Sequence, residues 1–474
     1  MSTRTWFRIH SFTGVITGLL LFVICWSGTF AVISNELDWL VAPQVRVDPL
    51  GEQITPGAIK SAAEKAYPES SFSWMILPKN NRLPASVNLI LPDESYVEVL
   101  VNPYTAEVLN PPSGYDLAIF FRQFHTNLFG LEYKLGNYIV FSFGLILMTS
   151  LVSALFLYKR WWTRFFSWKR NRSGQSYWTQ LHKLAGVWSL WFLTIIAITG
   201  AWYFFESLRL DLGDGKVNYV GETEFAIIQP AVPTSDPALP HLPLDSLVAK
   251  AKAIWPNFEI VEIAKGWYSE SSESIYLAGH LDNPLVRERG VQMQFDPRTG
   301  EVLWKNAAGD LPAYWLWSNM ADPLHFGNFG GLISKVIWFL FGLLLCGLIL
   351  TGTYLHIKKL HQKNGWQRHG WRGTWWAIGI TIFILLATIP YGFESARWYG
   401  PVVDGVRQLP DLFIGVKLFI IAWTLLTLAM ILAWVMMLWK AAKQSKSPGY
   451  KDSVGSASGV NVRPTSQSEK KQVY

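Results

Sequence analysis

The sequence predicts a membrane-embedded all-α helical bundle of six transmembrane helices, a duplicated four-helix core plus two, with two α+β domains outside the membrane. Three observations support this fold class. Hydrophobic residues make up 50% of the 474 residues and charged residues only 16%, against about 25% charged in an average soluble domain. Six long stretches contain no charged side chain, and three short phrases occur twice in the same order.

Each of the six uncharged stretches is long enough to cross a bilayer, which takes about 20 helical residues. They are Ser11–Asn35, Leu135–Tyr158, Leu184–Phe205, Val336–Ile357, Gly373–Phe393 and Leu418–Trp439. The first stretch follows Arg4 and Arg8, as the core of a signal peptide would. Its apolar run exceeds the roughly 7–15 residues of such a core and no A-x-A site follows, so we expect a retained helix.

The distribution of basic residues predicts the topology. About half of the 41 Lys and Arg residues, but only two of the 34 Asp and Glu residues, fall in the segments 1–10, 159–182, 358–372 and 440–474. The positive-inside rule places these segments, and with them both termini, in the cytoplasm. Because topology accounts for the net charge of +7, nucleic acid is not expected as a partner, and the lipid bilayer is.

The resulting plan alternates helices with segments on either side of the bilayer. In order it comprises helix 1–35, outer domain 36–134, helix 135–158, cytoplasmic basic loop 159–183, helix 184–205, outer domain 206–334, helix 335–357, cytoplasmic loop 358–372, helix 373–393, outer loop 394–417, helix 418–439 and cytoplasmic tail 440–474. The tail is rich in Ser, Gly and Lys, a composition typical of disorder.

The chain contains the same unit twice. In each copy a helix starts with His-x3-Gly, and a second Gly lies 18 residues after the His. The first of the three matched phrases is this helix motif, His10–Gly14 with Ser27-Gly28 against His182–Gly186 with Thr199-Gly200. The other two are Asn102–Leu109 against Asp296–Leu303 and His125–Gly130 against His325–Gly330. Repetition in one order indicates duplication. Two units of helix, α+β domain and helix give a four-helix core with a pseudo-twofold axis along the membrane normal, to which the last two helices are added.

The phrases at Asn102 and Asp296 predict hairpin turns, because Asn/Asp-Pro followed by Thr-Gly/Ala stands between β-rich runs. Strands are expected before the turns and helices earlier in each domain. These elements are the strands Tyr96–Val101 and Val291–Phe295 and the helices Pro56–Ala66 and Leu244–Ile254.

Five of the nine histidines lie beside membrane helices: His10, His182 and His356 at cytoplasmic ends, His125 and His325 on the outer side. Such an imidazole can be an axial haem ligand, a proton relay or an interfacial residue. Recurrence in both repeats favours haem-iron ligation, and the twofold axis would pair His10 with His182 and His125 with His325. His356 breaks the symmetry; it could replace either cytoplasmic partner or ligate a further haem.

Other polar residues carry weaker signals. Arg122, three residues before His125, can pair with a haem propionate or an anionic substrate, although a lone interfacial Arg is more often solvated. The remaining histidines are expected on the solvated surface; they are His241, His280, His361 and His369.

Several chemistries are excluded. The two cysteines, Cys25 and Cys346, lie in apolar runs and cannot supply a disulfide framework, a thiolate zinc site or an iron–sulfur cluster. No C-x-x-C-H is present for covalent c-type haem, and no Walker loop or G-x-G-x-x-G for a nucleotide. If the protein moves electrons, the donor must be a membrane quinol or a separate reductase protein.

The two H-x3-G helix starts and the two N/D-P-x-T-G/A-E-V-L turns resemble those of the PepSY-associated transmembrane family, the iron-regulated membrane proteins of bacteria. The resemblance covers residues 1 to about 360, and some members of the family are similar to ferric-siderophore reductases. It implies PepSY folds for the two periplasmic domains, location in the bacterial inner membrane, and haem in the bundle of the reductase-like members.

We therefore expect a haem protein that passes electrons across the inner membrane to reduce a periplasmic ferric-siderophore for iron acquisition. His10, His125, His182, His325 and His356 are the expected axial ligands of the haem iron. The 18 helical residues between the repeated motifs span about 27 Å at 1.5 Å each, so at least two haem b groups are needed.

Two rival functions remain open. One is a binding or regulatory membrane protein whose PepSY modules bind a partner or inhibit a peptidase without redox chemistry. The other is a permease in which the histidines relay protons. The redox function requires a cofactor, and neither rival does.

The predicted topology can be tested with reporter fusions. Fusions after Lys169 and Trp366 should report a cytoplasmic location, and fusions near Asn102 and Thr299 a periplasmic one, because Lys and Arg are retained on the cytoplasmic side. A cytoplasmic signal at Asn102 would overturn the charge argument and reverse the direction of electron flow.

Overall fold

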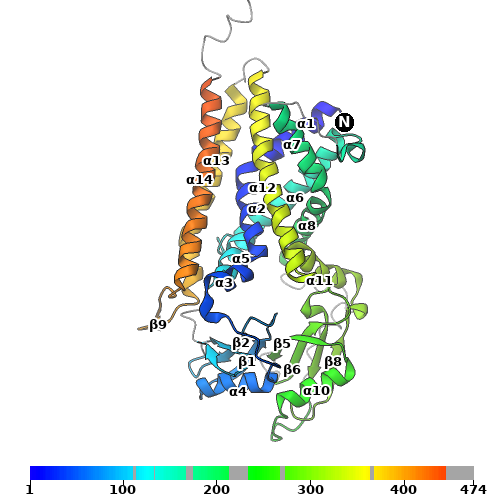
Figure 1. Ribbon diagram of the computed structural model, residues 1–474, viewed down its shortest axis with the longest axis vertical. Coiled ribbons are helices and arrows are strands. Elements are labelled where there is room, and N and C mark those ends of the chain that lie inside the picture. Colours follow the sequence, from blue (N-terminus) through cyan, green and yellow to red (C-terminus); the bar gives the residue numbers. More distant parts are fainter. Residues whose placement is uncertain are drawn as a thin grey trace, which may run out of the picture.

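A computed structural model of the chain describes residues 1–78, 80–94, 96–109, 114–132, 134–166, 175–212, 233–266, 273–362 and 368–444. Figure 1 shows long helices at one end of the molecule and strands with short helices at the other. The part of the predicted tail beyond Gln444 lies outside the described residues.

Within the described residues, five helices are long and apolar enough to cross a membrane. They belong to α6 (Leu135–Leu157), α8 (Leu190–Leu212), α12 (Gly331–Gln362), α13 (Arg368–Arg397) and α14 (Ile414–Gln444). A sixth span results if α1 (Thr3–Val15) and α2 (Gly18–Val32) cross together. The chain is therefore a multi-pass helical membrane protein, as the sequence predicts.

The first span is bent by 61° between α1 and α2, where the sequence predicts one helix. The hydroxyl of Thr17, at the bend, bonds the carbonyl of Thr13. In the second repeat, α7 (Gln175–Trp188) ends just before Ser189, whose hydroxyl donates to the carbonyl of Ala185 (2.7 Å). Hydroxyl side chains that donate a hydrogen bond to the carbonyl of the preceding turn often bend helices. Thr17 and Ser189 occupy equivalent positions, each seven residues after the histidine of its repeat.

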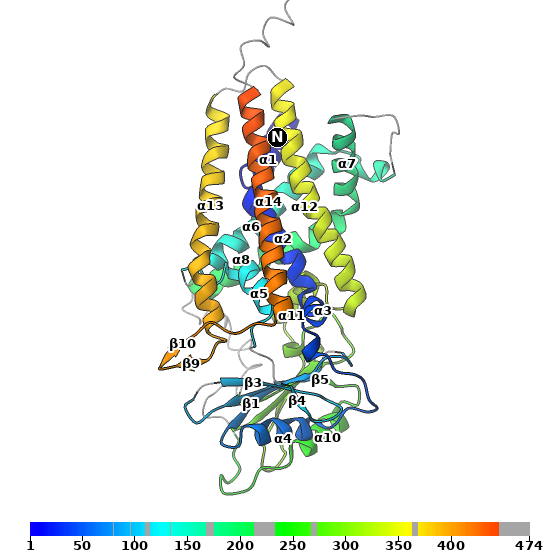
Figure 2. The same cartoon turned by 60° about the vertical axis from the view of Figure 1, so that its left-hand side comes forward.

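The core of the bundle is formed by two close helix pairs, α6 with α8 and α2 with α12. Gly144 of α6 faces Gly200 of α8 so closely that a Cβ on Gly144 would lie 2.3 Å from the Gly200 carbonyl carbon. Small residues allow membrane helices to approach in this way. Helices α13 and α14 lie along one side of the bundle (Figures 1 and 2), in contact with α2 and α12 respectively.

Two short helices, α5 (Leu117–Asn127) and α11 (Ala313–Phe326), lie at the base of the bundle (Figure 1). On α5, Leu117, Phe121 and Phe124 are buried, a spacing that places them on one helical face. Helix α5 packs on α2 and α6, while α11 packs on α8. These contacts bring residues of both short helices into the bundle.

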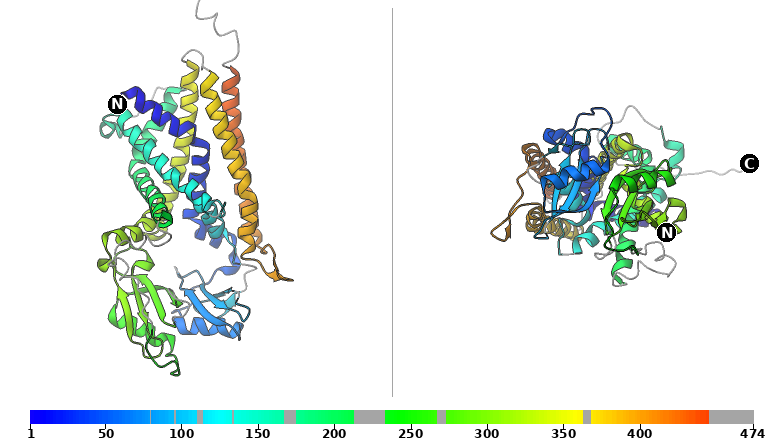
Figure 3. Two further views of the ribbon diagram at one scale, coloured as in Figure 1. Left: turned by 180° about the vertical axis from the view of Figure 1, so that it is seen from behind. Right: turned by 90° about the horizontal axis from the view of Figure 1, so that it is seen from below.

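Eight strands of the described residues form one antiparallel sheet in the order β4-β3-β2-β1-β5-β6-β7-β8. They are β1 (Ser71–Ile76), β2 (Ala85–Ile90), β3 (Tyr96–Val101), β4 (Val108–Leu109), β5 (Glu259–Lys265), β6 (Ile275–His280), β7 (Gln292–Phe295) and β8 (Val302–Asn306). Helices α4 (Pro56–Ala66) and α10 (Leu244–Ile254) cover the face turned away from the bundle (Figure 3). The expected strands and helices are present, but the two halves share one sheet.

The junction of the two halves is related by approximate twofold symmetry. Met75 of β1 lies opposite Ile263 of β5, and both side chains are fully buried. The register shifts after Phe72 in the pairing of β1 with β2, and after Ile260 in that of β5 with β6. The predicted hairpin turns also match, since Ala106 and Gly300 have φ of 61° and 68°. These shared irregularities support the duplication.

Candidate functional site

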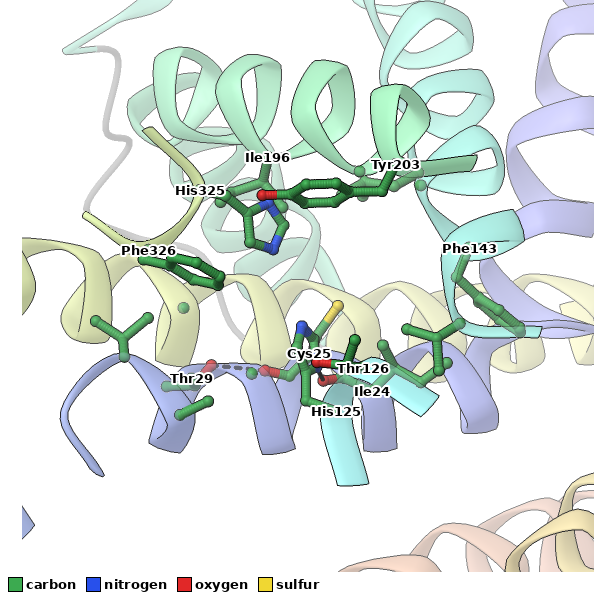
Figure 4. A pocket seen from close by; sticks show the side chains of 18 of the residues that line it. Ile24, Cys25, Thr29, His125, Thr126, Phe143, Ile196, Tyr203, His325 and Phe326 are labelled. Atoms are coloured by element: carbon green, nitrogen blue, oxygen red, sulfur yellow. Dashed lines mark hydrogen bonds between the residues drawn. The ribbon is translucent and has the colours of Figure 1, made fainter. Parts of the chain in front are cut away.

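The structure brings two of the predicted histidines close together. His125 lies near the end of α5 and His325 near the end of α11. Their ring centroids are 6.2 Å apart, and the ring planes make an angle of 29°. Figure 4 shows both rings turned into the same cavity.

The Nδ1 atom of each ring is held by an acceptor on a neighbouring helix. Nδ1 of His125 lies 3.0 Å from the carbonyl oxygen of Ile24 in α2, so this nitrogen donates. Nδ1 of His325 lies 2.8 Å from the hydroxyl of Thr199 in α8, which itself donates to the carbonyl of Ile195 and therefore accepts from the ring. This tautomer leaves the Nε2 lone pair of each ring for a ligand.

The other repeated histidines are held in the same way. Nδ1 of His10 in α1 lies 3.0 Å from the carbonyl oxygen of Ser150 in α6. Nδ1 of His182 in α7 lies 3.0 Å from the hydroxyl of Thr351 in α12, which donates to its own helix. The two imidazoles are close enough to interact electrostatically. Gly352 provides room, since a Cβ there would lie 3.2 Å from Cε1 of His182.

The remaining histidines are placed elsewhere. His356 of α12 stacks on Phe7 of α1, with ring centroids 6.4 Å apart. His241 is paired with Glu273 (3.8 Å), and Nδ1 of His280 lies 3.3 Å from the carbonyl oxygen of Val286. The side chains of His361 and His369 lie outside the described part of the chain.

His125 and His325 line a cavity of about 250 Å³ inside the bundle. Its walls come from α2, α5, α6, α8, α11 and α12, and most of them are apolar. Burial lowers the pKa of His125 to about 4 and the pKa of His325 to about 3, with the neighbouring His125 adding to the latter effect. Both imidazoles are therefore neutral near pH 7, as a metal ligand must be.

Gly28 allows the imidazole of His125 to lie directly against α2. A Cβ at this position would lie 2.5 Å from Cε1 of His125, so the ring would have to shift. The Ser27-Gly28 dipeptide of the repeat therefore has a structural reason: α5 needs a glycine on α2 to bring the imidazole against the helix.

A polar network beside His325 was not predicted from the sequence. The hydroxyl of Tyr203 donates to Asp322 (2.7 Å), and Arg287 forms a salt bridge with the same carboxylate. The ring of Tyr203 also meets His325 edge-on, with centroids 5.2 Å apart. The sequence does contain an indication of this network: Asp322 stands three residues before His325, in the position that Arg122 has before His125.

A second unpredicted feature fixes the start of α5. The Asp38 carboxylate, on α3 (Ser34–Val41), accepts from the backbone N–H groups of Leu117 (2.8 Å) and Ala118 (2.9 Å). Asp116 accepts from the N–H of Ile119 (2.7 Å). The first free N–H groups of α5 are thus bound by two acidic side chains.

The two carboxyl groups have raised pKa values. Burial, with the nearby Asp116 carboxylate second, raises the pKa of Asp38 to about 8. Burial also raises the pKa of Asp116 to about 6. At neutral pH the Asp38 carboxyl is therefore largely protonated in the folded protein, whereas in the unfolded chain it is ionised.

This difference predicts a stability that falls as the pH rises. Because the folded state binds the Asp38 proton more tightly, the contribution of this carboxyl to stability should decline from about pH 4 to about pH 8, by at most about 1.4 kcal/mol per pH unit. The buried histidines, whose pKa values are lowered, act in the opposite direction below about pH 6.5. Above about pH 7.5 the histidines are almost entirely neutral in both the folded and the unfolded chain, so the slope there comes mainly from this carboxyl. In thermal unfolding, the stability of Asp38→Asn should change less steeply with pH than that of the unmodified protein. The control Asp48→Asn, at an exposed position, should show the same pH dependence as the unmodified protein. An unchanged slope in Asp38→Asn would contradict the assignment.

The comparison with known families identifies the family of the chain. The family described as PepSY-associated TM region matches residues 7–359. No curated protein matches the sequence. The matched segment contains both repeats and their histidines and ends before α13. Because it covers well over half of the 474 residues, the chain belongs to the PepSY-associated TM region family.

Proposed function

We propose that the protein is a b-type haem protein of the bacterial inner membrane that passes electrons across the membrane and reduces a periplasmic ferric-siderophore. The single observation that carries the proposal is the hydrogen-bonding pattern of the paired histidines. In each of the four, Nδ1 is bound to an acceptor on a neighbouring helix; these are His10, His125, His182 and His325. Hydrogen bonds of this kind orient metal-ligating imidazoles.

The separation of His125 and His325 fits a single iron between them. His125 and His325 would hold the iron of one haem through the Nε2 atoms that their Nδ1 hydrogen bonds leave available. The observed separation is 6.2 Å. Both rings are neutral, and the cavity walls are mostly apolar, as a haem pocket requires.

Arg122 is suited to hold the acidic edge of the cofactor. It lines the cavity but is exposed, so its guanidinium lies at the mouth rather than in the apolar interior. Guanidinium groups bind carboxylates in a bidentate manner. Arg122 would therefore pair with a haem propionate, while Asp322 on the opposite helix is already neutralised by Arg287.

When bound, haem supplies one-electron transfer. Fe(III) of the chelate gains one electron and becomes Fe(II), which a hard-oxygen chelator holds less tightly. A membrane quinol or a separate reductase protein supplies the electron, because the sequence carries no nucleotide motif. The role of this chain's residues is to orient the imidazoles, keep them neutral and exclude water.

The proposal also places the molecule in the membrane. The two α+β halves adopt PepSY folds and lie in the periplasm, and both termini are cytoplasmic; the charge distribution supports this orientation. His10 and His182 would hold a second haem at the cytoplasmic end. His356, beside Phe7 of the same helix as His10, is a further ligand candidate at that end.

Haem ligation can be tested by substitution. His125→Ala and His325→Ala should each abolish the same haem, because both rings bind one iron, and His10→Ala should abolish a different one. His280→Ala is the matched control, since its ring contacts a backbone carbonyl in the sheet region. Haem content and the reduced-minus-oxidised Soret spectrum of the purified protein give the measurement. Colourless protein from haem-replete cells would favour the non-redox or permease function.

The direction of the reaction can be tested in liposomes. Ferric chelate added to the sheet side of reduced protein should reoxidise the haems, because the His125 and His325 pair lies nearest the sheet. In His325→Ala, reoxidation should be lost while the His10 and His182 haem stays reducible. Reduction of chelate at the wild-type rate by this variant, or a single haem per chain, would contradict the scheme.

A further inference from the structure

Helices α13 and α14 lie beyond the matched family segment, and the duplication gives them no counterpart. Besides α2, α3 and α12, they contact α5, the helix of His125. The ring of Trp423 in α14 meets three phenylalanines of α5 edge-on, at interplanar angles between 78° and 84°. The centroid distances are 5.1 Å to Phe121, 6.0 Å to Phe120 and 6.0 Å to Phe124. Trp423 is 6% exposed and Phe121 is fully buried.

Helix α13 completes the cover over the end of α5. Ser395 donates to Gln123 of α5, and Tyr391 donates to Glu132 just beyond it (2.5 Å). A Cβ on Gly392 would lie 3.2 Å from the ring of Phe129. Both added helices therefore contact α5 or the turn that follows it.

The equivalent helix of the second repeat is held differently. Ala321 and Leu324 of α11 stand where α5 has Phe121 and Phe124, so the large aromatic rings are missing there. Instead, Arg287 binds Asp322 and Arg289 donates to Asn319 (3.0 Å), both from the strand region. Among the described residues, Trp423 of α14 makes ring contacts with α5 and with Phe30 of α2, and none with α11.

We propose that the α13–α14 hairpin is a positioning element for His125, acting mainly through Trp423. An 11-residue helix is too short to be stable alone, so its placement depends on what packs against it. An axial ligand must be held within about 0.5 Å of its productive position. Trp423 packs on the turns of α5 that carry the imidazole and thereby fixes its orientation. This inference rests on the proposed function only where it concerns the haem.

Trp423 positions α5 by the packing of its ring and not by a hydrogen bond of its indole N–H group. Its indole Nε1 is buried and has no hydrogen-bond partner among the described residues. A ring without the N–H group should therefore serve nearly as well. Trp423→Phe should restore the behaviour that Trp423→Ala loses.

The same helix offers a matched control. Trp434 is 3% exposed and packs on Phe22 of α2, with ring centroids 5.9 Å apart. It lies 11 residues, about three turns, further along α14, near Gly18 rather than α5. Trp434→Ala removes an equally buried indole from the same helix without touching the Trp423 contacts.

Two measurements on the full-length protein test the proposal. Amide hydrogen exchange should be about tenfold faster or more in α5 of Trp423→Ala, with α11 unchanged, and Trp434→Ala should leave α5 protected. The midpoint potential and the low-temperature electron paramagnetic resonance signal should shift for the haem at His125 and His325 but not for the other. Trp423→Leu serves if the alanine variant does not fold.

The outcomes separate the two proposals. Faster exchange confined to α5 supports the positioning role even in a protein without haem, in which case the proposed function alone fails. Unchanged exchange in α5, or equal loss of protection in Trp434→Ala, overturns the positioning role. An altered exchange with an unmoved haem potential would show that Trp423 supports the fold without positioning the ligand.

Discussion

A polar ring in an apolar bundle must satisfy its N–H group, and this requirement governs how the repeated histidines are built into the structure. Leaving such a donor unpaired costs about 1–3 kcal/mol. In every case the acceptor belongs to a different helix from the histidine; the acceptors are the carbonyls of Ile24 and Ser150 and the hydroxyls of Thr199 and Thr351. A single hydrogen bond therefore fixes both the rotation of the ring and the register of two helices.

Much of this arrangement could be predicted from the sequence. Uncharged stretches predict helices because burying a charge in lipid is costly, and paired phrases predict the repeat that brings His125 opposite His325. The acceptors could not be predicted, since a backbone carbonyl such as that of Ile24 has no signature in the sequence. The single sheet was also missed, because edge pairing between β1 and β5 depends on how the two halves meet in space.

The departures from symmetry reveal different constraints on the two halves. Arg122 and Asp322 occupy equivalent positions of the two repeats but carry opposite charges. Asp322 forms a salt bridge with Arg287 and accepts a hydrogen bond from Tyr203. Helix α11 is thus linked by polar contacts to the sheet region, while α5 is packed by aromatic rings from α14. The two imidazoles are equivalent in their own hydrogen bonds and differ in what holds their helices.

Duplication offers a direct route to a site with two equivalent donors. A twofold axis places each residue near it opposite its own counterpart, as it does Met75 and Ile263 in the sheet and His125 and His325 in the bundle. One histidine per repeat is then sufficient to bring two imidazoles together in the bundle. Helices α5 and α11 follow β4 and β8 in the sequence, and these are the two edge strands of the sheet. The two imidazoles thus come from equivalent positions of the two repeats, and their ring centroids lie 6.2 Å apart.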